Sequence, residues 1–292
     1  MNNIIKLSMV FIRKKKVKGT DYAYLVRSVW DKNANTSRQQ TIKYLGKIST
    51  ITINDIPFEY RNDMRVLAFL SSYGLQKKLS PIMLSKLRQQ ILLGLSNGNL
   101  SHIIQIYEKY TESFGLIDFY DDLLKPVLYK IGDLWKDERI DIATEHMCSN
   151  LALSLVKIIN ERVHKPMNKK KILICTPDGE LHNIGCNIIE SVLLSRGYKV
   201  FNVSPSVPPD SITHYIGCIQ PDLILLSITL EENINAGRRL IKKIKSLFSI
   251  PIIVGGQAIK ETIRERVDVL TTENMSLDST LKLLKSITRN RC

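Results

Sequence analysis

The residues of this sequence best placed to do chemistry are a carboxylate and an imidazole two positions apart, Glu180 and His182. They follow an apolar run at 172–175, which predicts a buried strand, and precede an amphipathic stretch at 187–194, which predicts a helix. The pair therefore belongs to a loop or first helical turn at the carboxyl edge of an α/β sheet, where ligands bind. An imidazole nitrogen suits a borderline transition metal, and a nearby carboxylate can accept its other N–H and raise its basicity. Taken alone, the pair is equally typical of a solvated or capping histidine.

Two further apolar runs end in residues that suit a ligand. The run DLILLS ends at Ser227 and is followed by Thr229, which places two hydroxyls at the carboxyl end of a second predicted strand. The run PIIV is followed by Gly255 and Gly256, where missing side chains let a bulky ligand approach the backbone. The three sets of residues thus occupy the carboxyl ends of three predicted strands.

Together these residues resemble the cobalamin-binding domain of the methionine synthase and methylmalonyl-CoA mutase type. The hallmark of that family is Asp-x-His-x-x-Gly, then Ser-x-Leu or Ser-x-Thr, then Gly-Gly. Here the first motif reads ELHNIG and ends at Gly185, the second runs from Ser227 to Thr229, and the third is Gly255 with Gly256. Glu180 is a departure, because the family usually has Asp at that position.

The resemblance implies a role for each residue. His182 would displace the cofactor's own base and ligate cobalt from below, with Glu180 as its hydrogen-bonding partner. Ser227 and Thr229 would hydrogen-bond the displaced nucleotide tail. Gly255-Gly256 would leave room for that tail.

A helical pattern covers residues 62 to 164 and predicts four helices with short connections. Within it, Trp135 is followed by nine residues and then by Glu145 and His146. Such residues are ordinarily a core tryptophan and a solvated helix start. Beside a cobalamin-binding domain they resemble the helical cap of the adenosylcobalamin-dependent light sensors of the CarH type, which also carry Glu-x-His. The resemblance implies that Trp135 covers the upper face of the cofactor, that Glu145 contacts the adenosyl group, and that His146 becomes the upper cobalt ligand after illumination.

The formal net charge of +14 favours an acidic partner, and nucleic acid is the usual one. Much of this charge lies before residue 62, where strand-like runs at 22–30 and 39–45 are interleaved with aromatic residues. This segment also resembles the N-terminal region of certain insertion-sequence transposases. A DNA-binding role is therefore expected. A solvated basic sheet used for contacts between subunits, or a lysine-rich composition of the host, would explain the charge as well.

Other features narrow the class of protein. The sequence has no apolar stretch near the ~18 residues of a membrane span and no signal-peptide pattern, so a cytoplasmic protein without membrane contact is expected. The five cysteines show no Cys-x-x-Cys pairing and indicate reduced, mostly buried thiols. His102, His164 and His214 are expected to be packing or surface residues.

The sequence predicts a multidomain protein: a basic β-rich module at 1–62, a four-helix cobalamin cap at 76–164, and a flavodoxin-like, doubly wound α/β domain at 169–292. The expected function is a homo-oligomeric, light-responsive transcriptional regulator that binds adenosylcobalamin and changes assembly or DNA binding when the adenosyl group is lost. No catalytic constellation is expected, and a radical mutase would need a further barrel of ~250 residues. The alternatives are a corrinoid protein that carries a methyl group on methylcobalamin for methyltransferases, and a scaffold without cofactor.

Overall fold

The computed structural model describes residues 9–31, 35–73, 79, 81–163, 170–259, 269–272 and 275–289. The chain divides into two compact units. The first comprises Met1–Ile91 with Ile104–Leu123, and the second comprises Leu92–Ile103 with Leu124–Cys292. His164, most of the polar stretch after it, and the start of the last predicted strand lie outside the described residues. Among the described residues, none of the helices has the length and apolar character needed to cross a bilayer.

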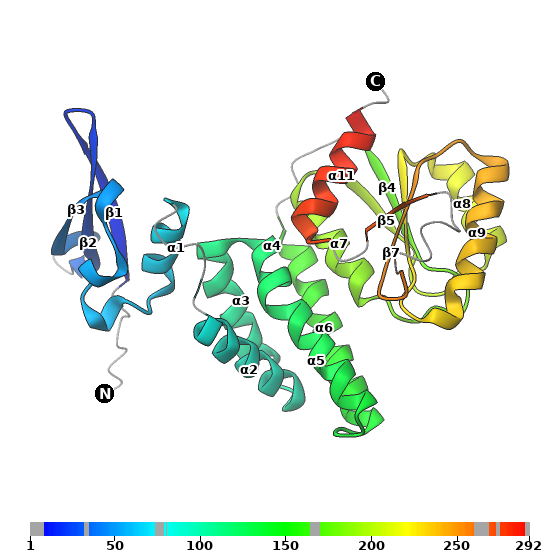
Figure 1. Ribbon diagram of the computed structural model, residues 1–292, viewed down its shortest axis with the longest axis horizontal. Coiled ribbons are helices and arrows are strands. Elements are labelled where there is room, and N and C mark those ends of the chain that lie inside the picture. Colours follow the sequence, from blue (N-terminus) through cyan, green and yellow to red (C-terminus); the bar gives the residue numbers. More distant parts are fainter. Residues whose placement is uncertain are drawn as a thin grey trace. The chain divides into compact units, whose positions relative to one another are not determined.

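The first unit begins with a three-stranded antiparallel sheet in the order β1-β2-β3, which confirms the β-rich N-terminus (Figure 1). The strands are β1 (Val10–Val17), β2 (Thr20–Asp31) and β3 (Thr36–Lys47). Lys18 and Gly19 connect β1 to β2 with φ values of 47° and 81°. Positive φ at both central residues is what a two-residue type I′ hairpin requires, and Gly19 adopts it without steric cost.

One face of this sheet packs against helix α1 (Met64–Ser72). Three short 3-10 turns connect the sheet to the helix: η1 (Ile48–Thr50), η2 (Ile53–Asp55) and η3 (Phe58–Tyr60). Asp63 caps α1 by accepting the backbone N–H groups of Arg65 and Val66. The shared core includes Ile12, Leu25, Leu45, Val66 and Leu70. The hydrophobic core of the N-terminal sheet therefore extends beyond residue 62.

A helical region follows, as the sequence predicts. Its elements are α2 (Pro81–Ser96), α3 (Leu100–Phe114), α4 (Leu116–Asp118), the π-helical segment η4 (Phe119–Leu124), α5 (Lys125–Lys136) and α6 (Ile142–Arg162). Pro81 stands at the first position of α2, where a missing N–H costs nothing. Asp141 caps α6 by accepting the N–H of Thr144 at 2.9 Å. Helices α5 and α6 form a hairpin within the second unit.

The second unit is built on a parallel five-stranded sheet in the order β5-β4-β6-β7-β8, which confirms the doubly wound domain. Its strands are β4 (Lys171–Cys175), β5 (Lys199–Asn202), β6 (Leu223–Ser227), β7 (Ile252–Gly255) and β8 (Leu270–Thr271). Its helices are α7 (Ile184–Ser195), α8 (Pro209–Ile219), α9 (Ile234–Leu247) and α11 (Leu277–Arg289), with a 3-10 turn, η5 (Glu231–Asn233), before α9. The strand order reverses between β4 and β6, and such folds bind ligands outside the carboxyl ends of the strands at that point.

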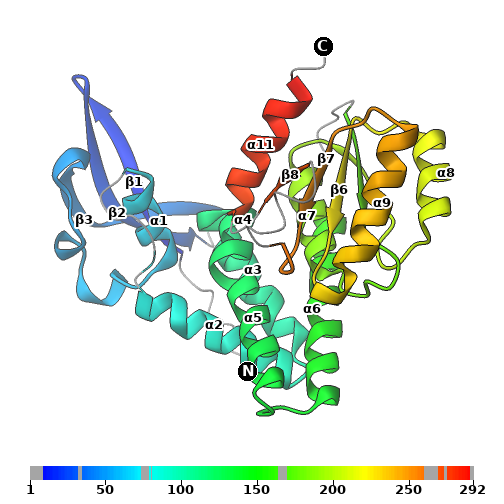
Figure 2. The ribbon, with the colours of Figure 1, turned by 45° about the vertical axis from the view of Figure 1, so that its right-hand side comes forward.

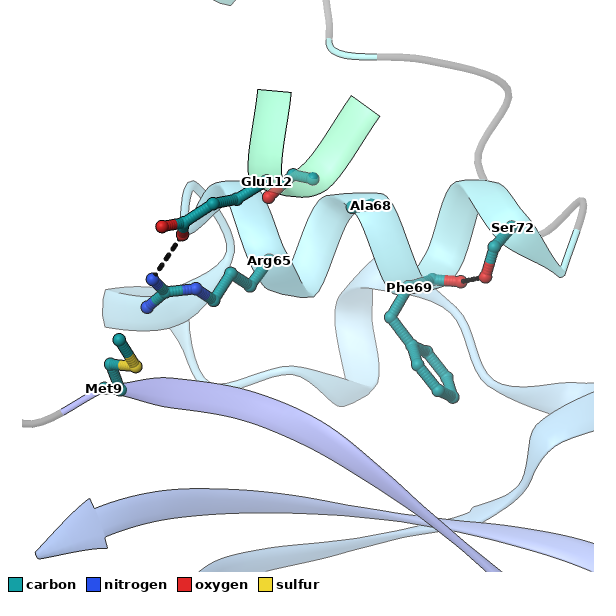
Figure 3. A pocket seen from close by; sticks show the side chains of 7 residues that line it. Met9, Arg65, Ala68, Phe69, Ser72 and Glu112 are labelled. Carbon is teal, nitrogen blue, oxygen red and sulfur yellow. Dashed lines mark hydrogen bonds and ion pairs between the residues drawn. The ribbon is translucent and has the colours of Figure 1, made fainter. Parts of the chain in front are cut away.

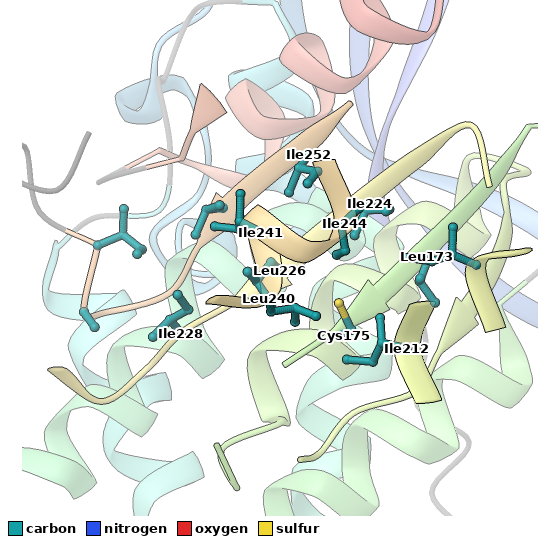
Figure 4. Packing of buried hydrophobic residues seen from close by; sticks show 14 residues of the cluster. Leu173, Cys175, Ile212, Ile224, Leu226, Ile228, Leu240, Ile241, Ile244 and Ile252 are labelled. Carbon is teal, nitrogen blue, oxygen red and sulfur yellow. The ribbon is translucent and has the colours of Figure 1, made fainter. Parts of the chain in front are cut away.

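Helices cover both faces of this sheet. On one face, α8 and α9 pack side chains such as Ile212 and Leu240 against Leu173, Ile224 and Leu226 of the strands (Figure 4). Strands that are covered on both faces are expected to be continuously apolar, and β4 after Lys171 and β6 before Ser227 are apolar and buried. Helix α7 packs against α6 of the helical region, and Figure 2 shows the two helices side by side. The hydroxyl of Ser191 on α7 donates to the side chain of Asn160 on α6. The cap helix is thus joined to the helix that follows His182.

Candidate functional site

The loop between β4 and α7 holds the imidazole of His182 in one orientation. Glu180 is fully buried, whereas the side chain of His182 is 55% exposed. Nδ1 of His182 lies 2.8 Å from Oε1 of Glu180, and the backbone N–H of His182 donates to the same oxygen at 3.0 Å. A carboxylate partner at Nδ1 places the proton there and leaves Nε2 as the nitrogen that can bind a metal.

The second carboxylate oxygen of Glu180 reaches the loop after β6. Oε2 accepts the backbone N–H groups of Thr229 at 2.9 Å and Leu230 at 3.0 Å, and the side-chain amide of Asn233 at 3.0 Å. The loops that leave β4 and β6 at the reversal of strand order are therefore joined through one buried side chain. Glu180 is the residue that fixes the predicted ligand loop to the neighbouring strand.

Both members of the pair have displaced pKa values. Burial alone would raise the pKa of Glu180, but hydrogen bonds from His182, Leu230 and Asn233 outweigh it and lower that pKa to about 2. The hydrogen bond to Glu180 raises the pKa of His182, and burial opposes this effect. The negative charges of Glu180, Glu145 and Glu232 raise the same pKa further.

The three predicted cap residues lie on the α5–α6 hairpin. Trp135 near the end of α5 is 48% exposed, so it is not a core residue, as a tryptophan on an apolar helix ordinarily is. Oε2 of Glu145 lies 2.7 Å from Nδ1 of His146, and Oε1 accepts the hydroxyl of Ser149 at 2.6 Å. His146 itself is 66% exposed. Because Glu145 also raises the pKa of His182, the first turn of α6 lies within electrostatic reach of the β4–α7 loop.

Ser227 stands where β6 ends and is half-buried. Burial raises the pKa of the Cys186 thiol, which is 1% exposed on the first turn of α7, to about 11, while the hydroxyls of Ser204 and Ser227 lower it. The thiol therefore stays protonated at neutral pH.

The predicted glycines have unequal surroundings. Gly256 has a φ of +111°, and a Cβ added to it would lie 2.1 Å from the backbone oxygen of Ile228. A Cβ on Gly255 would lie 2.6 Å from Oγ1 of Thr272. A Cβ on Gly185 would meet no protein atom within 4 Å. The protein's own packing requires the small residues at 255 and 256, whereas Gly185 borders open space.

These residues fit a corrinoid. A corrin ring supplies four equatorial nitrogens to its cobalt, so a single protein imidazole is a sufficient further donor. His182 offers Nε2 from a fixed ring, backed by a carboxylate of the kind that orients histidine ligands. Gly185 leaves the adjacent surface of α7 open to a large planar group.

A separate pocket of about 520 Å³ lies in the first unit and is lined by residues of α1 and α3 and by Met9, which precedes β1 (Figure 3). Arg65 and Glu112, its charged lining residues, form an ion pair at 2.7 Å across it. Phe69 and Met9 contribute apolar surface. None of the predicted site residues lines this pocket.

Sequence reasoning missed two contributors to the site. Asn233 holds Glu180 from the turn before α9, and Ser206 donates its N–H to Oγ1 of Thr176 at the end of β4. Glu180 lies 53 positions before Asn233, and the residues around Asn233 are polar, as in most loops, so no local pattern marks Asn233 as a site residue. Only the spatial neighbourhood of the two strand ends reveals its contribution.

Comparison with known families agrees with this geometry. Residues 170–273 match the B12 binding domain, and residues 87–160 match a second B12 binding domain model. The chain carries two B12-binding domains. The first match contains Glu180, His182 and the loop after β6, and the second contains Trp135, Glu145 and His146.

Relatives of the chain include corrinoid proteins and transcriptional repressors. A corrinoid protein of Desulfitobacterium hafniense is 24% identical over 183 residues, which are 60% of this chain and 83% of that protein. The HTH-type transcriptional repressor CarH of Myxococcus xanthus is 19% identical over 186 residues, which are 62% of this chain and 62% of that protein. The solved monomethylamine corrinoid protein of Methanosarcina barkeri shares the fold, with a TM-score of 0.60 at 12% identity over 69% of this chain and 99% of that one.

Proposed function

We propose that this protein is a cobalamin-dependent regulator that holds adenosylcobalamin between the α5–α6 hairpin and the carboxyl edge of the parallel sheet. The observation that carries the proposal is the fixed imidazole of His182, whose Nδ1 lies 2.8 Å from the buried carboxylate of Glu180 and whose Nε2 is left for a metal. The negative charge of Glu145, in the second matched segment, also raises the pKa of this imidazole, so residues of both matched segments act on it. Bound adenosylcobalamin supplies a light-sensitive cobalt–carbon bond.

Each residue of the proposed site has a separate role in binding the cofactor. Glu180 holds the proton on Nδ1 of His182, so Nε2 would be the nitrogen that ligates cobalt. Half-exposed Trp135 and Glu145, on the first turn of α6, would hold the adenosyl group. His146, whose Nδ1 lies 2.7 Å from Glu145, would supply a second imidazole to the metal after loss of the adenosyl group. The cap would then favour one of two states according to whether that group is bound.

The first unit carries the output of this switch, on DNA. The high positive charge of the chain and the basic strands of its N-terminal sheet support this assignment. The similarity to CarH, a transcriptional repressor of the helix-turn-helix type, supports it as well. The three-stranded sheet of this chain differs from such a module. Loss of the adenosyl group would change the oligomeric state and, through it, the affinity for DNA.

The proposal is tested by the visible absorption spectrum of the protein with adenosylcobalamin, in the dark and after green light, alongside size-exclusion profiles of both states. We expect the spectrum to convert on illumination and the assembly to change with it. His146→Ala should bind the cofactor in the dark but lose the photoproduct with two histidine ligands. His214→Ala, an exposed histidine on α8, is the matched control and should behave as the wild type. A photoproduct spectrum unchanged in His146→Ala would refute the role of that residue.

A second candidate function is a corrinoid protein that carries a methyl group for a methyltransferase. It is favoured by the Desulfitobacterium relative, of which the match covers 83%. In that case methylcobalamin should bind much more tightly than adenosylcobalamin, and a methyl donor with its methyltransferase should methylate the reduced cofactor. Competition between the two cobalamins for the purified protein separates the candidates, because the regulator requires preference for the adenosyl form.

A further inference from the structure

The strands of the first unit gather three tyrosines and three cations on one face of their sheet. In the cross-strand register, Tyr24 lies between Arg13 and Tyr44. In the next row, Tyr22 lies between Lys15 and Lys47. Residues directly opposite each other on neighbouring strands point to the same side of a sheet. We call these residues the tyrosine face: Arg13, Lys15, Tyr22, Tyr24, Tyr44 and Lys47.

The tyrosine face is the side of the sheet away from the core. Ile12, Ala23, Leu25 and Leu45 alternate with its members and are buried in the core that includes α1. Tyr44 is 52% exposed, and the three cations are exposed as well. The rings therefore lie outside the hydrophobic core, which is already complete on the other side of the sheet.

The three rings form a small aromatic platform. The ring centroids of Tyr24 and Tyr44 are 5.1 Å apart with planes inclined by 47°, and those of Tyr22 and Tyr44 are 6.3 Å apart with an inclination of 35°. The guanidinium of Arg13 lies 6.0 Å from the centroid of Tyr24. Tilted rings in contact keep part of each aromatic surface open to a further planar group.

The charge on the tyrosine face is largely uncompensated. Lys14, on the opposite side of β1, is paired with Asp21 at 2.7 Å, and Arg38 is paired with Asp31 at 3.1 Å. In the part of the chain that the structure describes, neither Lys15 nor Lys47 has an ion-pair partner. The acidic side chains of the sheet are thus used elsewhere, and the cations beside the rings remain available to anions.

We propose that the tyrosine face binds single-stranded nucleic acid, with unpaired bases stacked on the tyrosines and phosphates held by Arg13, Lys15 and Lys47. Rings on the outer side of a sheet can stack only on bases whose faces are open, and a duplex buries those faces against neighbouring base pairs. The inference rests on the proposed nucleic-acid output of the first unit, but it is independent of cobalamin binding. According to this inference, the nucleic acid that the first unit binds is single-stranded.

The test uses the full chain and a fluorescein-labelled thymidine oligonucleotide of about 12 nucleotides, within the usual range of site sizes. Fluorescence anisotropy should show binding to the single strand, and weaker binding to the same strand paired with its complement. Tyr44→Ala should weaken single-strand binding about tenfold, because one stacking surface is lost. Tyr44→Phe keeps the ring and should stay within about twofold of the wild type. Thermal melts of both variants check that the sheet remains folded.

The contribution of charge is tested by the double substitution Lys15→Ala with Lys47→Ala. It should weaken binding and make it less sensitive to salt, because fewer counterions are released. The matched control removes two exposed cations from α9, Arg239→Ala with Lys242→Ala, and should leave binding unchanged. An equal loss in the control would mean that net charge alone attracts the oligonucleotide, and would overturn the proposed site.

Two further outcomes would overturn the inference. One is tighter binding of the duplex than of the single strand, and the other is wild-type affinity of Tyr44→Ala for the single strand. Each measurement is repeated with adenosylcobalamin, and cofactor binding is followed separately by absorption. Cobalamin binding without any nucleic-acid binding would refute the inference but not the proposed cobalamin site. Nucleic-acid binding without cobalamin binding would refute the proposed cofactor but not the role of the tyrosine face.

Discussion

The two ligand sites proposed for this chain are built in opposite ways. In the second unit, one buried carboxylate, Glu180, accepts hydrogen bonds from His182, Thr229, Leu230 and Asn233 and fixes the position of a single imidazole. In the first unit, the tyrosine face consists of side chains on the outer side of a sheet whose strands pair through their backbones. One site is held by a buried network, and the other is a surface feature.

The difference predicts different responses to substitution. A change in the buried network leaves polar groups without partners, so it costs stability as well as ligand binding. A change on the open face removes a contact with the ligand and leaves the fold intact. The two tryptophans of the chain, Trp30 and Trp135, lie one in each unit and allow the two responses to be followed separately.

The largest expected effect is that of Glu180→Ala. The substitution leaves the partly buried N–H groups of His182, Thr229 and Leu230 and the amide of Asn233 without their acceptor, so we expect the second unit to lose about 3 kcal/mol of stability. Urea unfolding of the cofactor-free protein measures it, with Trp135 as the probe in a Trp30→Phe background.

Glu180→Gln is the matched control, because it keeps the shape and one acceptor oxygen and should lose less. Trp30, observed in a Trp135→Phe background, should report an unchanged first unit. A loss below about 1 kcal/mol for Glu180→Ala would mean that the network is not what holds the loop.

A second prediction compares the glycines of the cobalamin site. Gly256→Ala should destabilise the second unit by about 2 kcal/mol, because its Cβ would meet the backbone of Ile228 at 2.1 Å and its φ is +111°. Gly185→Ala should instead leave the cofactor-free protein unchanged or up to about 1 kcal/mol more stable, since alanine favours the helix. If the corrinoid lies against this turn, Gly185→Ala should still weaken cobalamin binding, measured by absorption titration. Unaltered affinity would place the corrinoid elsewhere.

The smallest expected effect is a pH dependence in the first unit. Hydrogen bonds from the backbone N–H and hydroxyl of Thr52, at 2.8 Å and 3.0 Å, lower the pKa of Asp55 below its ordinary value of 3.8. The ionised carboxylate therefore stabilises the folded state above that value, and the contribution is lost as the pH falls through the lowered pKa. Urea midpoints followed by Trp30 between about pH 5 and pH 3 should fall with acid, and Asp55→Asn should flatten the slope. A slope equal in both proteins would contradict the assignment.

The sequence predicted those parts of the structure that are local. The apolar runs before Glu180 and Thr229 are strands β4 and β6, and the stretch after His182 is α7, because buried parallel strands and amphipathic helices leave periodic patterns. The contact between Glu180 and Asn233 had no such pattern, since it joins residues 53 positions apart. Gly256 shows the same limit. The sequence shows that the residue is a glycine. It does not show that a Cβ at this position would clash with the backbone of Ile228, because that depends on how two loops pass each other.

The roles of Trp135, Glu145 and His146 in binding a cofactor stay predictions. Their exposure and the effect of Glu145 on His182 are compatible with those roles, and so is the match of residues 87–160 to a B12 binding domain. Ligation by His182 is the central claim, because each of the other roles depends on it.

The most direct test of that claim is the electron paramagnetic resonance spectrum of the protein with reduced cob(II)alamin, prepared from cells grown with ¹⁵N-labelled histidine. Nitrogen-15 below the cobalt splits each line into two, whereas the ¹⁴N of the cofactor's own base splits it into three. We expect doublets in the labelled wild type and in His214→Ala, and their disappearance in His182→Ala. Triplets in the labelled wild type would show that the cofactor keeps its own base, and would contradict the proposed site.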